Sequence, residues 1–182
     1  MKLKLEYKNI PTLAIGFTRA DDLFGKLISY FSKSKDKGSP THAFIVTEDH
    51  GQLFATEETA QGLRENTLET YTALDNRIVC MYYWKGFDDR NVRENVMRCL
   101  AETRRRAGEN SLYDFAGLLS FVPFLKIFFK PDPKKQWCSE NCASIMKMFG
   151  ATWIHDTCVT PLALMNMMRN TEECEAVLNY YQ

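Results

Sequence analysis

Cys138 combines a nucleophilic side chain with a favourable position in the chain. It follows a proline-bounded loop and begins an expected helix over residues 138–149. The free backbone N–H groups and the positive end of the helix dipole would therefore face its sulfur and favour the thiolate, which is the nucleophilic form of cysteine. The same N–H groups can stabilise an oxyanion. This setting predicts a thiol nucleophile for hydrolysis or acyl transfer.

A general base for this thiol would come from one of three histidines. His42 begins a strand-like segment directly after a Ser-Pro-Thr turn, whereas His50 lies in an expected hairpin turn and His155 lies in a segment without a clear pattern. A single histidine is more often a structural or surface residue than a catalytic one, although imidazole is the usual general base. We take His42 as the candidate base and ask which carboxylate could orient it.

The expected β-hairpin over residues 41–56, with its turn at residues 48–51, brings a carboxylate near His42. Its register decides which one. A two-residue loop sets Glu57 opposite or diagonal to His42, whereas a loop with an odd number of residues would present Glu58 instead. A carboxylate in this place would hold the imidazole tautomer and stabilise its cationic form, as in other nucleophile–base–acid triads.

The remaining elements would position these side chains. Apolar periodicity, cap residues and proline breaks predict the order helix, strands, helices, which is an α+β domain with an antiparallel sheet packed against helices. No linker or repeat divides the chain, so residues 1–182 are expected to form a single domain. The expected strands cover residues 41–47, 52–56 and 77–84, and the expected helices begin at a Thr18-x-x-Asp21 capping box, at Asp88 or Asp89, at Tyr113, at Cys138 and at Thr160-Pro161.

Composition narrows the class of protein and its compartment. A chain that is 45% hydrophobic and 13% aromatic is not generally disordered, and 23 basic against 23 acidic side chains argue against nucleic-acid binding by bulk charge. The first residues lack the apolar core of a signal peptide, and the apolar stretch over residues 115–129 is too short to span a membrane. We therefore expect a cytoplasmic protein with reduced cysteines, no nucleic-acid partner and no transmembrane segment.

Several segments share their order and spacing with the motifs of one known family. They are Asp21-Asp-Leu-Phe-Gly-Lys-Leu-Ile28, Ser39-Pro-Thr-His-Ala-Phe-Ile-Val46, Thr56-Glu-Glu-Thr-Ala-Gln-Gly-Leu63, Tyr113-Asp-Phe, Trp137-Cys-Ser-Glu-Asn-Cys142 and Thr160-Pro161. Together they resemble the permuted papain-like cysteine peptidases of the NlpC-like superfamily, in which the histidine precedes the cysteine. The resemblance implies a circularly permuted papain-like fold with Cys138 as nucleophile, His42 as general base, Glu57 as the acid that orients it, and Tyr113 in the substrate pocket.

The function that the resemblance implies is a cysteine hydrolase that cleaves an amide or peptide bond, or transfers the acyl group, without a metal or cofactor. Its substrate would be a peptide, an amide or an acyl small molecule. Two departures from the family pattern bear on this. Glu58 stands where the family usually has a small residue, so Glu58 competes with Glu57 as the orienting acid. Residues 115–129 are unusually apolar, which is typical of a core helix and packed loop but also fits a lid for a lipid or acyl substrate.

Two other readings use the same residues. Cys138-x3-Cys142 followed by His155-x2-Cys158 supplies four potential ligands for structural zinc in a binding protein. The interval between the pairs would hold most of a helix, however, and the apolar face of that helix already explains Cys142. A catalytically inactive family member that binds a ligand through the same cleft is the other alternative.

Overall fold

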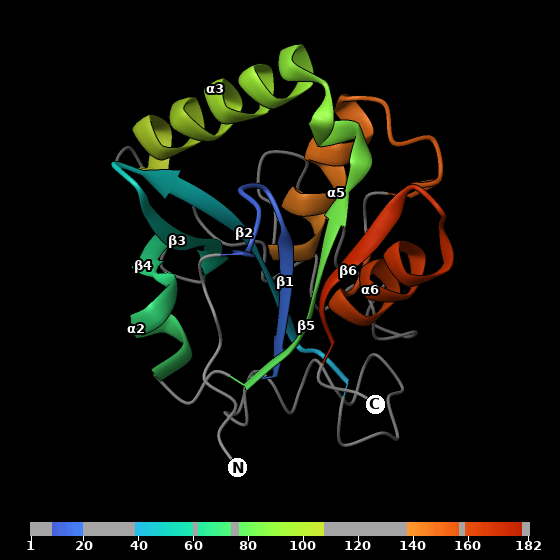
Figure 1. Cartoon of the computed structure of the whole chain (residues 1–182), viewed down its shortest axis with the longest axis horizontal. Helices are drawn as coiled ribbons and strands as arrows, with labels where there is room; N and C mark the ends of the chain where they lie inside the picture. Colours follow the sequence, from blue (N-terminus) through green and yellow to red (C-terminus); the bar gives the residue numbers. More distant parts are fainter. Residues whose placement is uncertain are drawn as a thin grey trace, which may run out of the picture.

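The computed structural model describes residues 9–19, 39–59, 62–73, 77–107, 138–156 and 159–179. It shows an α+β fold in which a six-stranded antiparallel sheet, ordered β4-β3-β2-β1-β5-β6, is packed against helices (Figure 1). The strands are β1 (Ile15–Arg19), β2 (His42–Asp49), β3 (Gln52–Thr59), β4 (Gly62–Thr67), β5 (Arg77–Trp84) and β6 (Cys174–Asn179). The helices are α2 (Leu68–Ala73), the 3-10 helix η2 (Lys85–Asp88), α3 (Arg90–Ala107), α5 (Cys138–Met148) and α6 (Pro161–Asn170).

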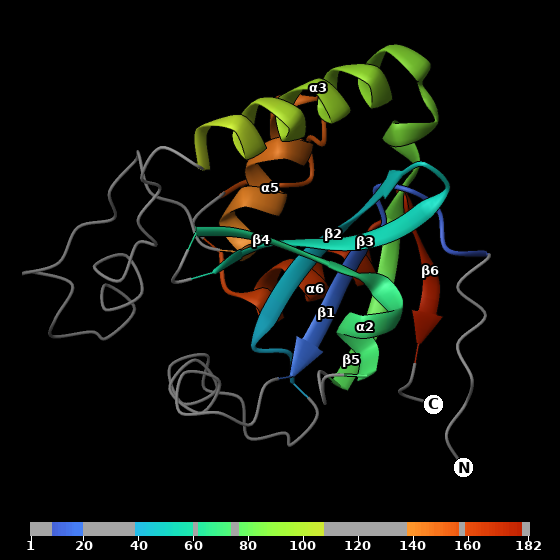
Figure 2. The same cartoon turned by 90° about the vertical axis from the view of Figure 1, so that its left-hand side faces the viewer.

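Helices cover both faces of the sheet. On one face, residues of α3, α5 and α6 share an apolar core with Ile15, Ile45 and Tyr82 of the central strands. On the other face, Leu68 of α2 belongs to a smaller apolar cluster with Phe44. In Figure 2, α3 and α5 lie above β3 and β4, whereas α2 lies below them. Because β2 is covered on both sides, its backbone is fixed where it carries His42.

The β2–β3 hairpin closes with a two-residue turn. His50 and Gly51 both have positive φ, of 49° and 78°, which is typical of a type I′ turn. The strands pair with Asp49 opposite Gln52, and the register continues to Ile45 opposite Thr56. The expectation of a hairpin here is confirmed, and of the loops considered, the structure selects the even-length one that sets Glu57 diagonal to His42.

The prediction that Thr18 caps a helix is wrong. Thr18 lies inside β1, where it is 1% exposed and pairs with His42 on one side and Ile78 on the other. A central strand bonds to a neighbour along each edge, and that long-range pairing outweighs the local cap preference of a threonine. The sequence pattern did not predict β1, β4, α2 or β6.

Gly16 has a steric reason to lie in β1. It pairs with Phe44 of β2, and the aromatic ring lies so close that a Cβ on Gly16 would overlap it. A side chain at this position would force the ring or the strand to move. Gly16 therefore lets β1 and β2 pack closely just beyond the pair that holds His42.

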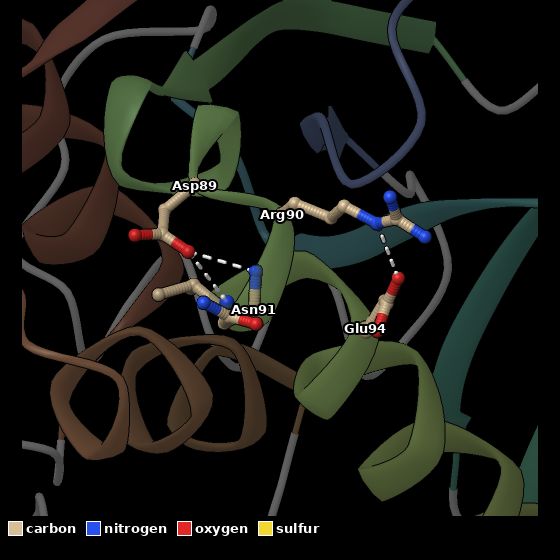
Figure 3. Close-up of polar contacts among 5 residues, drawn as sticks. Asp89, Arg90, Asn91 and Glu94 are labelled. Atoms are coloured by element: carbon tan, nitrogen blue, oxygen red, sulfur yellow. Dashed lines mark hydrogen bonds and ion pairs between the residues drawn. The ribbon is translucent and has the colours of Figure 1, made fainter.

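Helix α3 begins where an aspartate cap was expected. Asp89 accepts hydrogen bonds from the backbone N–H groups of Asn91 and Val92 at 2.7 and 3.2 Å (Figure 3). Arg90 and Glu94 form an exposed pair one turn apart, at 2.7 Å. The structure thus selects the second of the two candidate cap residues, because its carboxylate reaches the free N–H groups of the first turn.

The ends of α5 and α6 also match the sequence signals. Gly150, with φ of 108°, follows α5 and provides the left-handed residue that commonly ends a helix. Thr160 precedes α6 and accepts a hydrogen bond from the Ala163 N–H at 3.2 Å. Pro161 then occupies the first helical position, where its missing N–H has no cost. Both predicted helices are confirmed.

Some expectations concern residues outside the described ranges. These are the helices over residues 23–31 and near Tyr113, the apolar stretch over residues 115–129, the proline break at residues 131–133, and Cys158. Within the part of the chain that the structure describes, no helix combines the length and the apolar character needed to cross a membrane.

Candidate active site

Two chain segments that are distant in sequence bring Cys138 and His42 together. Cys138 is the first residue of α5 and His42 is the first residue of β2. The start of β2 is fixed by β1, since Thr18 pairs with His42 and the Thr41 N–H donates to the Thr18 carbonyl at 2.9 Å. Apolar residues of α5, including Cys142, share the core cluster of the sheet. Packing of the helix on the strand thus sets the thiol beside the imidazole.

Glu57 of β3 holds the His42 ring from one side. The His42 Nε2 lies 2.6 Å from the Glu57 Oε2, and the two side chains are 19% and 6% exposed. This short charge-assisted contact fixes the tautomer and the orientation of the ring. Because Glu57 occupies Nε2, the ring nitrogen left for a second partner is Nδ1.

Cys138 is the other side chain that interacts with the ring, and it changes the proton affinity of the imidazole. Burial is the largest single influence on the pKa of His42, and it lowers that pKa because it disfavours the cation. The charge interaction and hydrogen bond with Cys138, followed by the hydrogen bond and charge interaction with Glu57, outweigh burial and raise the pKa of His42 from 6.5 to about 10. The imidazolium is therefore the favoured form at neutral pH, which is the state that stabilises a neighbouring thiolate.

The raised pKa of His42 predicts a pH dependence of folding stability. The folded protein keeps this proton up to about pH 10, whereas the unfolded chain releases it near pH 6.5. The stabilising contribution is thus complete below pH 6.5 and is lost as the pH rises toward 10, at no more than about 1.4 kcal/mol per pH unit. Urea unfolding between pH 6 and 10 should show this decline, and His42→Asn should flatten it. Equal slopes in the two proteins would contradict the assignment.

Two other cysteines are as buried as Cys138, and a third, Cys174, is partly buried. Cys80 and Cys142 are each 2% exposed, as Cys138 is. Burial raises the pKa of Cys80 to about 12 and that of Cys142 well above its usual range. Burial also raises the pKa of Cys174 to about 12. These thiols are held in the protonated, unreactive form. The expectation that Cys142 packs in the core is confirmed.

Ser139 is a residue of this region to which the sequence assigned no role. It is completely buried, and its hydroxyl donates to the Val159 carbonyl at 2.6 Å. The bond joins the first turn of α5 to the residue that precedes the Thr160 cap of α6. In the sequence, only the position of Ser139 next to Cys138 indicates a role. The hydrogen-bond partner of Ser139 is a backbone carbonyl, and a pattern of side chains does not reveal such a partner.

The residues considered as zinc ligands are arranged differently. Cys138 and Cys142 are buried, whereas His155 is exposed and its carbonyl accepts a hydrogen bond from the Lys147 Nζ at 2.8 Å. In the described ranges, no group of three or more His, Cys, Asp or Glu side chains is placed to hold a metal ion. Cys158, Tyr113 and the side chain of Glu58 lie outside what the structure describes.

Comparison with known proteins does not add to these observations. No protein-family model matches the sequence, and no curated protein is significantly similar to it. The site itself consists of an imidazole that contacts a carboxylate through Nε2 and of a thiol at the start of a helix.

Proposed function

We propose that this protein is a cysteine hydrolase with a circularly permuted papain-like arrangement, in which Cys138, His42 and Glu57 form the catalytic triad. The observation that carries the proposal is the position of His42, whose Nε2 lies 2.6 Å from the Glu57 carboxylate and whose pKa is raised by interaction with the Cys138 side chain as well. A nucleophile, a base in contact with it, and a third group that orients the base are the parts that thiol catalysis requires.

The first step forms the acyl-enzyme. The Cys138 thiolate attacks the carbonyl carbon of an amide or ester, and the C–S bond forms as the carbonyl π electrons move to oxygen. The positive charge on His42, stabilised by Glu57, favours the thiolate before attack. In the thiolate–imidazolium pair that this proposal requires, His42 has taken the thiol proton before the attack, so the attack itself transfers no proton.

The start of α5 suits the oxyanion that this attack generates. The first N–H groups of a helix have no partner within the helix, and Cys138 is the first residue of α5. In this proposal its backbone N–H donates to the tetrahedral oxyanion, and the helix dipole adds a favourable field. Mutational losses of one such donor in other enzymes are about 10²–10³ in rate.

Collapse of the intermediate and hydrolysis complete the cycle. His42 donates its proton to the leaving nitrogen or oxygen as that bond breaks, which leaves a thioester on Cys138 and a neutral imidazole. The imidazole then takes a proton from water, which attacks the thioester, and the product acid leaves while the thiolate–imidazolium pair returns. An acceptor other than water would give acyl transfer by the same steps.

The remaining parts of the proposal follow from the sequence. We propose a single domain over residues 1–182 that acts in the cytoplasm on a peptide, an amide or an acyl small molecule, without a metal or cofactor. Residues 115–129 are apolar enough to bind a lipid or acyl group, so the proposed substrates include lipids and acyl compounds. The proposal includes neither a nucleic-acid partner nor a transmembrane segment.

Site-resolved alkylation tests this proposal. The full-length protein is treated with iodoacetamide near pH 6, and the rate at each of the six cysteines is read by peptide mass spectrometry. Cys138 should react at least about tenfold faster than Cys80 and Cys142, because its thiolate is stabilised while the others are held protonated. All three are 2% exposed, so access alone does not produce the difference.

Labelling in urea provides the control for this experiment. Unfolding removes both burial and the His42 contact, so the advantage of Cys138 should disappear in the denatured chain. Uniformly slow labelling of the folded protein would contradict the thiol mechanism and favour an inactive, ligand-binding role.

A further inference from the structure

We infer that Ser139 is a positioning residue for the nucleophile, and this inference rests on the proposed function of Cys138. Its buried hydroxyl anchors the first turn of α5 to the Val159 carbonyl at 2.6 Å. The anchor fixes the orientation in which Cys138 meets His42.

The geometry of a helix explains why this anchor matters for Cys138. Adjacent helical residues project about 100° apart around the axis, so Cys138 and Ser139 contact different parts of the fold. Cys138 interacts with His42 of the sheet, and Ser139 donates a hydrogen bond to the segment that leads into α6. Two contacts at different points of the circumference prevent both rotation and sliding of the first turn.

The first turn of a helix is also the part with the weakest internal support. Its N–H groups lack intrahelical partners, so its conformation depends on contacts to the rest of the protein. Ser139 is 0% exposed, and its bond spans 20 residues of the chain, so it is a tertiary contact and not a local cap. A misplacement of about 1 Å in a catalytic group can cost about 10²-fold in rate.

Loss of the hydroxyl has two separable effects. In Ser139→Ala the Val159 carbonyl loses its buried donor, which lowers stability. The same change releases the first turn of α5, so the Cys138 thiol spends less time against His42. The second effect changes how thiol reactivity depends on pH, whereas general destabilisation of the core does not.

The test measures alkylation of Cys138 from pH 5 to 9 in the full-length protein, together with urea unfolding. Ser139→Ala should slow alkylation at pH 6 by about tenfold and give a rate that rises steeply with pH, as for an isolated thiol. Ser139→Thr, which keeps the hydroxyl, should retain the wild-type pH profile. A wild-type profile in Ser139→Ala, or an alanine-like profile in Ser139→Thr, would overturn the inference.

Two control variants separate positioning from stability. Ser144→Ala removes a hydroxyl farther along the same helix and should leave the pH profile unchanged. Ile154→Val removes a methylene from the buried segment between α5 and α6, which destabilises by about 1 kcal/mol, and should also leave the profile unchanged. If Ile154→Val also alters the pH profile, the change seen in Ser139→Ala comes from lower stability, and the positioning role of Ser139 is contradicted. If wild-type Cys138 itself reacts no faster than Cys142, the proposed function fails, and this outcome is distinct from failure of the Ser139 inference.

Discussion

Replacing His42 with alanine should slow alkylation of Cys138 at pH 6 by about 10²-fold. A free thiol with a pKa near 8.5 is only roughly 0.3% ionised at this pH. In the proposed mechanism the imidazolium, held by Glu57, stabilises the Cys138 thiolate of the wild-type protein, and the raised pKa of His42 keeps that cation present at pH 6. Part of the gain in thiolate is offset because a stabilised thiolate is a weaker nucleophile.

The measurement is the second-order rate constant for iodoacetamide at Cys138, resolved by peptide mass spectrometry. His155→Ala is the matched control, because His155 is exposed and only its backbone carbonyl makes a described hydrogen bond, to Lys147. It should react like the wild-type protein. Cys142 serves as an internal reference, since it is equally buried and should change little in either variant. Similar rates in the wild type and His42→Ala would remove His42 from the mechanism.

The second large effect is expected at Glu57. Glu57→Ala removes the carboxylate that lies 2.6 Å from the His42 Nε2 and leaves a largely buried cation without its partner. Hydrogen bonds to charged groups contribute roughly 1.5–3 kcal/mol, so stability below pH 6.5 should fall by about 2 kcal/mol. Alkylation of Cys138 at pH 6 should slow as well, because a less stable imidazolium supports the thiolate less.

The loss of stability in Glu57→Ala should depend on pH, because it depends on the protonation of His42. Loss of Glu57 lowers the pKa of His42 from about 10 toward its usual value. The destabilisation of Glu57→Ala should therefore be largest where His42 is protonated, below pH 6.5, and should fade as the pH approaches 10. Urea midpoints at several pH values measure this trend, and Glu57→Gln, which keeps an acceptor oxygen, should show a smaller loss.

Glu94→Gln is the control for removal of a carboxylate. Glu94 pairs with Arg90 on the exposed side of α3 at 2.7 Å, and such surface pairs contribute at most about 1 kcal/mol. Neither the alkylation rate of Cys138 nor the pH trend should change in this variant. If Glu57→Ala destabilises equally at pH 6 and pH 10, Glu57 does not interact with a protonated His42.

Local signals in the sequence determined much of the fold. The bounds of β5 were predicted as observed, because its apolar and aromatic residues form one uninterrupted run. The cap of α3 at Asp89 and the cap of α6 at Thr160 follow from hydrogen bonds that act within one helical turn. The hairpin turn at His50-Gly51 is likewise local, because two residues with positive φ close it.

The sequence also identified the candidate residues of the site, but it did not decide which carboxylate contacts His42. It placed Cys138 at the start of a helix and His42 at the start of a strand, both of which the structure confirms. It left Glu57 and Glu58 as alternatives, since hairpin register depends on the length of the loop. The observed loop has an even length, and it is the Glu57 carboxylate that contacts His42.

Only the tertiary structure decided how these segments meet. Thr18 has the pattern of a helix cap, yet it lies in a central strand, because β2 and β5 satisfy its backbone on both sides. The packing of α5 on β2 brings Cys138 to His42, and the Ser139 bond to Val159 fixes that helix from another side. The sequence by itself determined which residues could do chemistry, since side-chain type and local capping are short-range properties. Their juxtaposition depends on contacts between distant segments, which only the packed sheet and helices define.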